Sequence, residues 1–236
     1  MQRYFVRHKE NDSFFLSDDD SYHVVTVMRM KINDTVEIVY ENRVYLSSIV
    51  SLEKNVCCKI IKELDNINNH LNVVIAQALV KEQKMDYILQ KSCELGVSEI
   101  IPINTSRSIV KVDKNDSKKI VRWEKILKEA SEQSKRNFIP KLGTILDIKE
   151  LVKLPFNHKF LCSVNEKSKT IKTVLSNVSI SDTIIFVIGP EGGFSENEEE
   201  LLISNGYIPI SLGNNVLRTE TASSFILSVV NYKFMG

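Results

Sequence analysis

The feature that most restricts the fold is an alternation of short apolar runs with amphipathic stretches over residues 71–234. The apolar runs have the length and composition of buried strands, and the stretches between them have helical spacing. Strands are predicted at residues 71–79, 98–106, 158–164, 182–188 and 207–212. Helices are predicted at residues 83–95, 118–136, 170–178, 195–205 and 218–234. This alternation predicts an α/β domain with a mostly parallel sheet covered by helices on both faces.

The first part of the chain has a different, β-rich pattern. Residues 34–52 alternate and are rich in β-branched and aromatic side chains, with a hairpin turn at "YENR", and residues 55–64 form a further strand. Residues 21–30 favour a short helix, because Ser21 can cap it and Val24, Val25 and Met28 keep helical spacing. We therefore expect a small β-barrel over residues 1–68, a linker near Asn66, and a second domain over residues 72–236.

Composition and charge exclude several classes of protein. The chain is 43% hydrophobic and 26% charged with a net charge of +1, which is typical of a soluble globular protein and neither requires nor excludes a nucleic-acid partner. Its apolar runs are shorter than the roughly 20 residues of a membrane span, and its start lacks the apolar core of a signal peptide. Cys57, Cys58, Cys93 and Cys162 form no CxxC pattern. Reduced thiols in a cytoplasmic protein without a metal site are expected.

Two glycine-bearing segments follow the last predicted strands, "IGPEGGFSENE" at residues 188–198 and "SLGNNVLRTETA" at residues 211–222. Parallel sheets bind ligands beyond the carboxyl ends of their strands, where both segments lie. Glycine permits positive φ and a close approach of ligand to backbone, while Pro190 fixes one dihedral angle. Ser195 and Glu198 have the spacing of a capping box, so the next helix should begin there. The first segment is therefore expected to be a rigid backbone cradle.

The chemistry of the first segment favours a flat heterocycle over a phosphate. It contains no lysine, and the acidic first turn of the following helix would repel an anion. Its spacing matches neither GxxxxGK[ST] nor GxGxxG. For one such segment alone, an ordinary tight strand-to-helix turn is the alternative to a ligand site. The presence of two such segments favours the ligand site.

Taken together, these two segments closely resemble the signature segments of the SPOUT-class RNA methyltransferases. More narrowly, they resemble the bacterial family that methylates uridine N3 in small-subunit (16S) ribosomal RNA. Residues 83–108, 122–136 and 23–30 resemble other parts of that family. The resemblance therefore extends over nearly the whole chain.

The resemblance implies a C-terminal trefoil knot, a PUA-like RNA-binding barrel before it, and S-adenosylmethionine as the cofactor. It also implies an obligate homodimer in which both chains build each RNA site. The last helix is apolar enough to contribute to the dimer interface through Phe225, Ile226, Leu227, Val229 and Val230.

Carried onto this sequence, the resemblance assigns cofactor binding to the two glycine segments. The residues are Ile188, Gly189, Pro190, Glu191, Gly192, Gly193, Leu212, Gly213, Asn214, Val216 and Leu217.

Arg218 and Glu220 are the candidate catalytic residues. A cation is disfavoured at a helix N-terminus, so Arg218 at the start of the last helix suggests a functional reason. A guanidinium near a uracil carbonyl would stabilise the negative charge that develops there. Glu220 is the candidate base, although an acidic residue is also favourable in a first helical turn for structural reasons alone.

Basic residues in several parts of the chain are candidates for contact with RNA phosphates, which supply most nucleic-acid affinity. Solvated surface charge is the alternative for each. The candidates are Arg3, Arg7, His23, Arg29, Arg107, Arg122 and Arg136.

Two other functions stay open at this point. One is a SPOUT methyltransferase that acts on another RNA or on ribose, which would leave uridine N3 free. The other is a non-catalytic RNA-binding factor in ribosome assembly that kept the fold and would have no reason to bind S-adenosylmethionine.

Overall fold

A computed structural model describes residues 1–65, 71–114 and 116–234 of the chain. Its contacts divide the chain into two compact units, one formed by residues 1–68 and 128–139 and the other by residues 69–127 and 140–236. Helix α3 (Ser117–Gln133) therefore starts in the second unit and ends in the first. The linker predicted near Asn66 lies outside the described residues.

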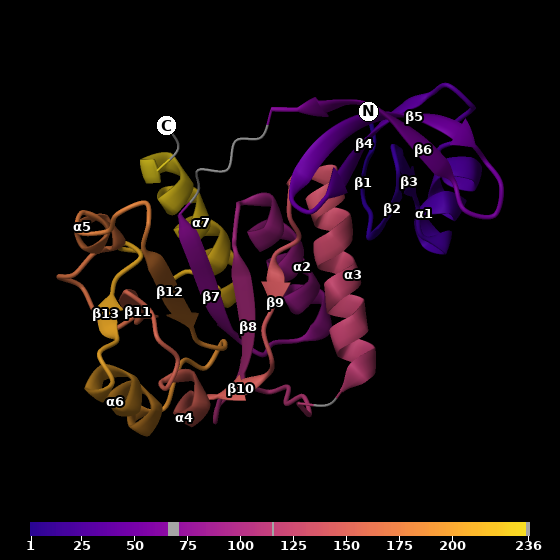
Figure 1. Ribbon diagram of the computed structural model, residues 1–236. Helices are drawn as coiled ribbons and strands as arrows, with labels where there is room; N and C mark the ends of the chain where they lie inside the picture. The colour runs from indigo at the N-terminus through magenta and orange to yellow at the C-terminus, as the bar shows by residue number, and fades with distance from the viewer. Residues whose placement is uncertain (66–70, 115, 235–236) are drawn as a thin grey trace. The chain divides into compact units, whose positions relative to one another are not determined.

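The first unit contains a sheet of six strands in the order β1-β4-β5-β6-β3-β2 (Figure 1). Strand β1 pairs with β4 in parallel, and the other pairings are antiparallel. Among the described strands, β1 and β2 form the two edges, so this sheet is not established as a closed barrel. Its elements are β1 (Arg3–Phe5), β2 (His8–Glu10), β3 (Ser13–Phe15), α1 (Asp18–Tyr22), η1 (His23–Val27), β4 (Thr35–Tyr40), β5 (Arg43–Ser51) and β6 (Cys57–Leu64).

Local sequence explains the main features of this unit. Glu41 and Asn42 both have positive φ, at 49° and 61°, as a two-residue turn between twisted strands requires. This confirms the predicted hairpin. A helix is present in the region predicted at residues 21–30, as the end of α1 followed by one turn of π-helix, η1, but the predicted cap is wrong: the helix begins earlier, with Ser17 as its N-cap, and Ser21 lies inside α1. Its Val24 is fully buried in the core of the unit with Phe14 and Ile38.

The second unit contains a sheet in which every described pairing is parallel. The strand order is β10-β8-β7-β12-β11-β13, with β9 also paired to β8. The strands are β7 (Asn72–Ala78), β8 (Glu99–Asn104), β9 (Lys141–Leu142), β10 (Leu146–Asp147), β11 (His158–Cys162), β12 (Thr183–Ile188) and β13 (Ile208–Ile210). The predicted parallel sheet is confirmed.

Helices cover both faces of this sheet. The second unit contains α2 (Glu82–Glu94), α4 (Ile148–Leu151), α5 (Ile171–Leu175), α6 (Glu196–Ser204) and α7 (Thr219–Phe234), besides the first part of α3. Alternate residues Val74, Ala76 and Ala78 of β7 pack with residues of α4 and α6. The intervening Gln77 points to the other face and is hydrogen-bonded to α7. Strands β12, β7 and β8 are seen side by side in Figure 1.

Several details differ from the sequence prediction. The helix predicted over residues 170–178 is the short α5, and α3 ends three residues before the predicted boundary at 136, close to Lys135, which has a φ of 61°. The short elements β9, β10 and α4 were not predicted, because such short segments lack a clear period. In α7, the side chains of Ile226, Leu227 and Val230 are buried within the chain itself. Only Phe225 and Val229 of the predicted interface residues are half-buried.

Candidate active site

The two glycine segments follow strands of the same parallel sheet. Gly189 follows Ile188 at the end of β12, and the segment with Gly213 follows β13. Because the described strands are parallel, the carboxyl ends of β7, β12 and β13 lie at one edge of the sheet. Gln77 of β7 is the register partner of Ile188 and belongs to that edge. This is where open parallel sheets bind their ligands.

A buried chain of hydrogen bonds joins the first glycine segment to the start of α7. Gln77 Nε2 donates to Thr219 Oγ1 at 2.9 Å, and Thr219 Oγ1 donates to the carbonyl oxygen of Gly189 at 2.8 Å. Gln77 is fully buried, and its Oε1 has no hydrogen-bond partner among the described residues. Such an atom calls for an explanation, for example a ligand or a water molecule. Sequence reasoning missed Gln77 and Thr219, and the available signal was a single glutamine within an apolar strand.

The first glycine segment is a tight turn with an open side. Gly193 N donates to the carbonyl oxygen of Pro190 at 2.9 Å, and Gly193 has a φ of 67°. A Cβ at Gly189 would lie 3.1 Å from the ring of Phe194, whereas a Cβ at Gly193 would meet nothing within 4 Å. Glycine is therefore required at position 189, because the Phe194 ring leaves no room for a side chain there. Gly193 leaves free space beside the backbone.

Residues after β8 hold this loop in place. Arg107 Nη1 donates to the carbonyl oxygens of Gly192 at 3.2 Å and Phe194 at 3.0 Å. Ser106 donates through its backbone N at 2.7 Å and its Oγ at 2.8 Å to the carboxylate of Glu198. The predicted capping box of Ser195 and Glu198 is present at the start of α6. Arg107, a candidate for RNA contact, thus also supports the glycine segment.

The second glycine segment is more exposed. Gly213 has a φ of 132°, a Cβ there would meet nothing within 4 Å, and its backbone N donates to Ser211 Oγ at 3.2 Å. Asn214 is exposed, and Val216 has 79% of its surface exposed although it is apolar. Leu212 and Leu217 are half-buried. An exposed apolar side chain beside an open glycine is a suitable contact for a flat heterocycle.

Three charged side chains connect the first glycine segment with α7. Lys84 Nζ, in the first turn of α2, lies 2.9 Å from Glu191 Oε1 and 3.4 Å from Glu220 Oε2. The hydrogen bond from Lys84 lowers the pKa of Glu191, and the same bond raises the pKa of Lys84. Glu220 Oε2 is buried and has no hydrogen-bond partner among the described residues. Sequence reasoning missed Lys84, because its two partners come from distant segments.

Arg218 occupies the position before α7. Its carbonyl oxygen accepts from the backbone N of Thr221 and of Ala222, both at 2.9 Å, so its backbone starts the helix. Its side chain is exposed, and in the described part of the chain it has no hydrogen bond or ion pair. An unpaired cation at a helix N-terminus is electrostatically disfavoured. The structure therefore offers no structural role for this guanidinium.

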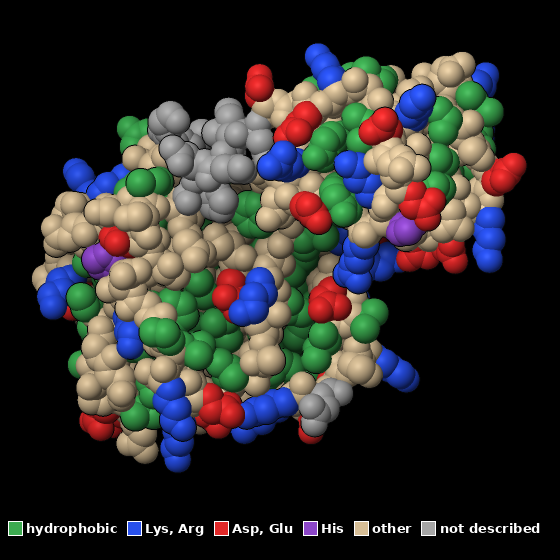
Figure 2. All heavy atoms as spheres, viewed as in Figure 1, with side chains coloured by type: hydrophobic (Ala, Val, Ile, Leu, Met, Phe, Trp, Pro, Cys, Tyr) green, Lys and Arg blue, Asp and Glu red, His purple; other side chains and the backbone are tan. Residues whose placement is uncertain are grey.

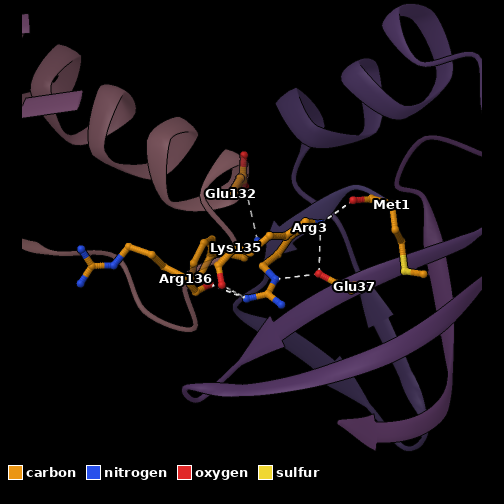
Figure 3. A network of polar contacts seen from close by, with 7 residues as sticks. Met1, Arg3, Glu37, Glu132, Lys135 and Arg136 are labelled. Carbon is orange, nitrogen blue, oxygen red and sulfur yellow. Dashed lines mark hydrogen bonds and ion pairs between the residues drawn. The ribbon is translucent and has the colours of Figure 1, made fainter. Parts of the chain in front are cut away.

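Two of the RNA candidates belong to a network in the first unit (Figure 3). Arg3 Nε lies 2.9 Å from Glu37 Oε2, and its Nη1 donates to the carbonyl oxygens of Lys135 and Arg136. Arg3 is thus engaged within its unit. The Arg136 side chain points away from this network, and its guanidinium lies over the Phe138 ring at 4.3 Å.

The other candidates differ in their surroundings. Arg7 and Arg29 are exposed, and Arg29 has a φ of 52° just after η1. His23 Nδ1 is hydrogen-bonded to Tyr4 Oη at 2.9 Å. Arg122 forms ion pairs with Glu82 and Asp86 of α2.

The visible surface has mixed charge. Basic and acidic side chains are interspersed on the face in Figure 2, in keeping with the net charge of +1. Within residues 1–65, 71–114 and 116–234, no group of three or more His, Cys, Asp or Glu side chains is arranged to hold a metal ion. No helix in these ranges is long and apolar enough to cross a membrane.

The fold and the site together define an α/β protein with a ligand site built from glycine segments at the carboxyl edge of a parallel sheet. The family model described as RNA methyltransferase domain matches residues 67–231 of this chain. A protein of Bacillus subtilis strain 168, "Ribosomal RNA small subunit methyltransferase E", is 34% identical, and the alignment covers 99% of this chain and 97% of that protein. A protein of the same name from Mesomycoplasma hyopneumoniae strain 232 is 34% identical, with 97% and 98% covered.

A solved structure agrees with these relatives. Ribosomal RNA small subunit methyltransferase E from Neisseria gonorrhoeae, bound to S-adenosyl methionine, superimposes with a TM-score of 0.87 at 30% identity, over 99% of this chain and 98% of that chain. The chain therefore belongs to the RNA methyltransferase family. The resemblance carried by the two glycine segments is confirmed.

Proposed function

We propose that this protein transfers a methyl group from S-adenosylmethionine to N3 of a uridine in small-subunit (16S) ribosomal RNA. The observation that carries the proposal is the pair of open glycine segments at one sheet edge in a chain of this family, followed by Arg218, whose side chain is unpaired within the described residues. The relatives named above support the RNA substrate, and the Neisseria gonorrhoeae structure supports the cofactor. An activity on this RNA would take place in the cytoplasm.

The site has properties that fit S-adenosylmethionine. Space beside Gly193 and Gly213 lets a ligand approach the backbone, and exposed Val216 can pack against a heterocycle. The buried Oε1 of Gln77 is an acceptor without a hydrogen-bond partner among the described residues. We propose that the cofactor is held there by the eleven residues assigned to cofactor binding. They are residues 188–193 and residues 212–217 without Asn215.

When bound, S-adenosylmethionine supplies an electrophilic methyl group whose sulfur departs with the bonding electron pair. Uridine N3 carries a weakly acidic proton that must leave before or during attack. We propose that Glu220 accepts this proton, so that the nitrogen electron pair can form the new N–C bond. Arg218 would stabilise the negative charge that spreads to a uracil carbonyl.

The two units would have different functions. We propose that residues 1–68 form a PUA-like RNA-binding domain and that residues 72–236 form the SPOUT methyltransferase domain. Exposed Arg7 and Arg29, with His23, Arg107 and Arg136, are the proposed RNA contacts. Arg3 is also a proposed RNA contact, and its bonds to Glu37, Lys135 and Arg136 support the unit from within.

A trefoil knot is proposed for the C-terminal part of the second unit. Ser211 N donates to the carbonyl oxygen of Lys169 at 2.7 Å, and Ile171 N donates to the carbonyl oxygen of Ser211 at 3.1 Å. These bonds support a close passage of the second glycine segment along the segment before α5.

We also propose a homodimer in which both chains contribute to each RNA site. Because Ile226, Leu227 and Val230 are buried within the chain, the remaining candidates on α7 are Phe225 and Val229, together with Tyr232, which is 88% exposed. Sedimentation velocity at low micromolar concentration should show a species of twice the 27.0 kDa chain mass. A single species of monomer mass would contradict the dimer.

The function is tested by incubating the protein with S-adenosylmethionine and unmodified small-subunit RNA, followed by digestion and mass spectrometry of the nucleosides. We expect 3-methyluridine. A 2′-O-methylated nucleoside would indicate a ribose methyltransferase. Methylation of another RNA instead would show that small-subunit RNA is not the substrate. Failure to bind S-adenosylmethionine in a calorimetric titration would favour a non-catalytic assembly factor.

A further inference from the structure

The hydrogen-bond chain that joins β7, α7 and the first glycine segment has a fixed direction. Gln77 Nε2 donates to the carbonyl oxygen of Ala78 at 3.0 Å and to Thr219 Oγ1 at 2.9 Å. Thr219 Oγ1 in turn donates to the carbonyl oxygen of Gly189 at 2.8 Å. Both carbonyl oxygens can only accept, so the Gln77 amide must donate at each of its bonds and the single hydroxyl proton of Thr219 must point to Gly189. The Thr219 side chain is thus bonded to β7 and to the first glycine segment at the same time.

Stability alone does not explain a glutamine at this place in β7. Gln77 is fully buried, and its Oε1 has no hydrogen-bond partner among the described residues. A buried amide oxygen without a partner destabilises the folded chain. Val73 and Ile75, on the same face of the strand, are apolar and buried and carry no such cost. The other end of the amide, which donates to Thr219, is therefore the part that needs a reason.

Arg218 is placed by its backbone. Its side chain has no hydrogen bond or ion pair among the described residues, so no contact of the guanidinium fixes where it lies. Its carbonyl oxygen accepts from the backbone N of Thr221 and of Ala222, both at 2.9 Å. Thr219 is the next residue along the chain. Its bond to Gly189 therefore holds the backbone beside Arg218 against the segment that is proposed to bind the cofactor.

We propose that Gln77 and Thr219 are positioning residues that hold Arg218 at the place beside the cofactor segment where it acts in methyl transfer. This inference rests on the proposed function. Transfer depends on the alignment of the reacting groups, and a displacement of about 1 Å can cost about a hundredfold in rate. Neither Gln77 nor Thr219 is proposed to touch the cofactor or the RNA. Both act through Arg218.

Loss of the chain should slow the reaction more than it weakens cofactor binding. Gln77→Met keeps an unbranched side chain but removes the amide, and Thr219→Val keeps the shape but removes the hydroxyl. We expect single-turnover methyl transfer to fall about tenfold in each variant. The affinity of Gln77→Met for S-adenosylmethionine should stay within a few-fold of wild type. Thr219→Ser keeps the hydroxyl and should stay within about threefold of the wild-type rate.

A double-variant cycle tests whether the effect passes through Arg218. In the Arg218→Ala background the group to be positioned is gone, so Gln77→Met should change the rate by less than about twofold there. A matched control lies at the amino end of β7, where Asn72 Nδ2 donates to Thr183 Oγ1 of β12 at 3.1 Å. Thr183→Val removes a hydroxyl that also accepts from an amide, and it should keep the wild-type rate.

Hydrogen–deuterium exchange followed by mass spectrometry gives a readout that does not depend on activity. Without the bonds of the Thr219 side chain, the first turn of α7 should open more often. The backbone amides of Thr221 and Ala222 should therefore exchange at least threefold faster in Gln77→Met and in Thr219→Val than in wild type. Thr219→Ser and Thr183→Val should exchange at the wild-type rate.

The experiment measures single-turnover formation of 3-methyluridine, amide exchange, calorimetric affinity for S-adenosylmethionine and the thermal midpoint of each folded variant. Wild-type protein that forms no 3-methyluridine would overturn the proposed function and the inference together. If wild type forms this product, a wild-type rate in both Gln77→Met and Thr219→Val would overturn the inference alone. The same holds for a tenfold loss by Gln77→Met that persists in the Arg218→Ala background, and for unchanged amide exchange in both variants.

Discussion

The glycines of the two glycine segments have different structural roles. Gly189 has no room for a Cβ because of the Phe194 ring, whereas Gly193 and Gly213 have positive φ and open space. Packing therefore explains the first glycine, and backbone conformation explains the other two, whose open space fits the proposed cofactor site. The Arg218 side chain has no hydrogen bond or ion pair among the described residues.

Gly193→Val should abolish binding of S-adenosylmethionine. A β-branched side chain fills the open space beside the loop and disfavours the φ of 67°. Gly206→Val is a matched control, because Gly206 has a φ of 86° and open space too but lies beyond the end of α6. Both variants should lose about 1–2 kcal/mol of stability, and only Gly193→Val should lose binding in calorimetry. Wild-type affinity in folded Gly193→Val would show that this segment does not hold the cofactor.

Arg218→Ala should slow single-turnover methyl transfer by about a hundredfold or more, as expected for removal of a group that stabilises developing negative charge. Affinity for S-adenosylmethionine should stay within a few-fold of wild type. Saturating RNA should not restore the rate, because a contact made in the transition state is not recovered by filling the ground-state site. Arg218→Lys keeps the charge without the planar fork and should recover only part of the rate. Full recovery at saturating RNA would make Arg218 a binding residue.

The C-terminal end of helix α3 is held in the first unit by charged side chains that are largely buried. Lys128 forms ion pairs with Asp20 of α1 and, at 3.2 Å, with Glu132. Glu132 Oε1 also accepts from the backbone N of Phe5 at 3.4 Å. Beyond the helix, Lys135 lies 3.1 Å from Glu37 of β4 (Figure 3). These contacts explain why residues 128–139 belong to the first unit rather than the second.

Glu132 should make stability depend on pH. Burial raises its pKa from 4.5 to about 7. Between these values the folded chain retains a proton that the unfolded chain has released, so this contribution is complete below about pH 4.5 and is lost as the pH rises through about 7. The loss is at most about 3 kcal/mol.

The measurement is a set of thermal melts of wild type and Glu132→Gln from pH 5 to pH 8. The variant cannot ionise, so the midpoint of wild type should fall relative to the variant as the pH rises. Glu124→Gln, at an exposed position of the same helix, serves as the control and should follow wild type. A constant difference between wild type and Glu132→Gln across this range would contradict the assignment.

For the whole molecule, the division into units does not follow the order of the sequence. The first unit takes residues 128–139 from the middle of the chain, while the glycine segments and Arg218 lie wholly in the second unit. RNA binding and cofactor binding are thus proposed for units that share one helix, α3.

Removal of residues 1–68 should leave cofactor affinity within a few-fold of wild type and weaken RNA binding at least tenfold at matched salt. The truncated protein should also melt at a lower temperature, because residues 128–139 lose their partners, including Asp20 and Glu37. Calorimetry, a filter-binding assay and thermal melts measure the three effects. Full RNA affinity in a folded truncated protein would contradict the proposed division of work.

Much of the fold and part of the site follow from local patterns. The strand and helix alternation, the hairpin at Glu41 and Asn42 and the capping box of Ser195 and Glu198 depend on neighbouring residues, so they can be read directly from the sequence. The same holds for the two glycine segments, since only glycine readily adopts their positive φ.

Tertiary structure alone decided which distant residues meet. Gln77 reaches Thr219, Lys84 lies between Glu191 and Glu220, and Arg107 supports the first glycine segment. Strand register and helix packing create these contacts, and no local periodicity encodes them. The same reason applies to Arg3, a proposed RNA contact whose partners Glu37, Lys135 and Arg136 also hold it within the unit. The sequence determined the chemical groups and the local backbone, whereas the fold determined which of those groups are paired and which stay available to a ligand.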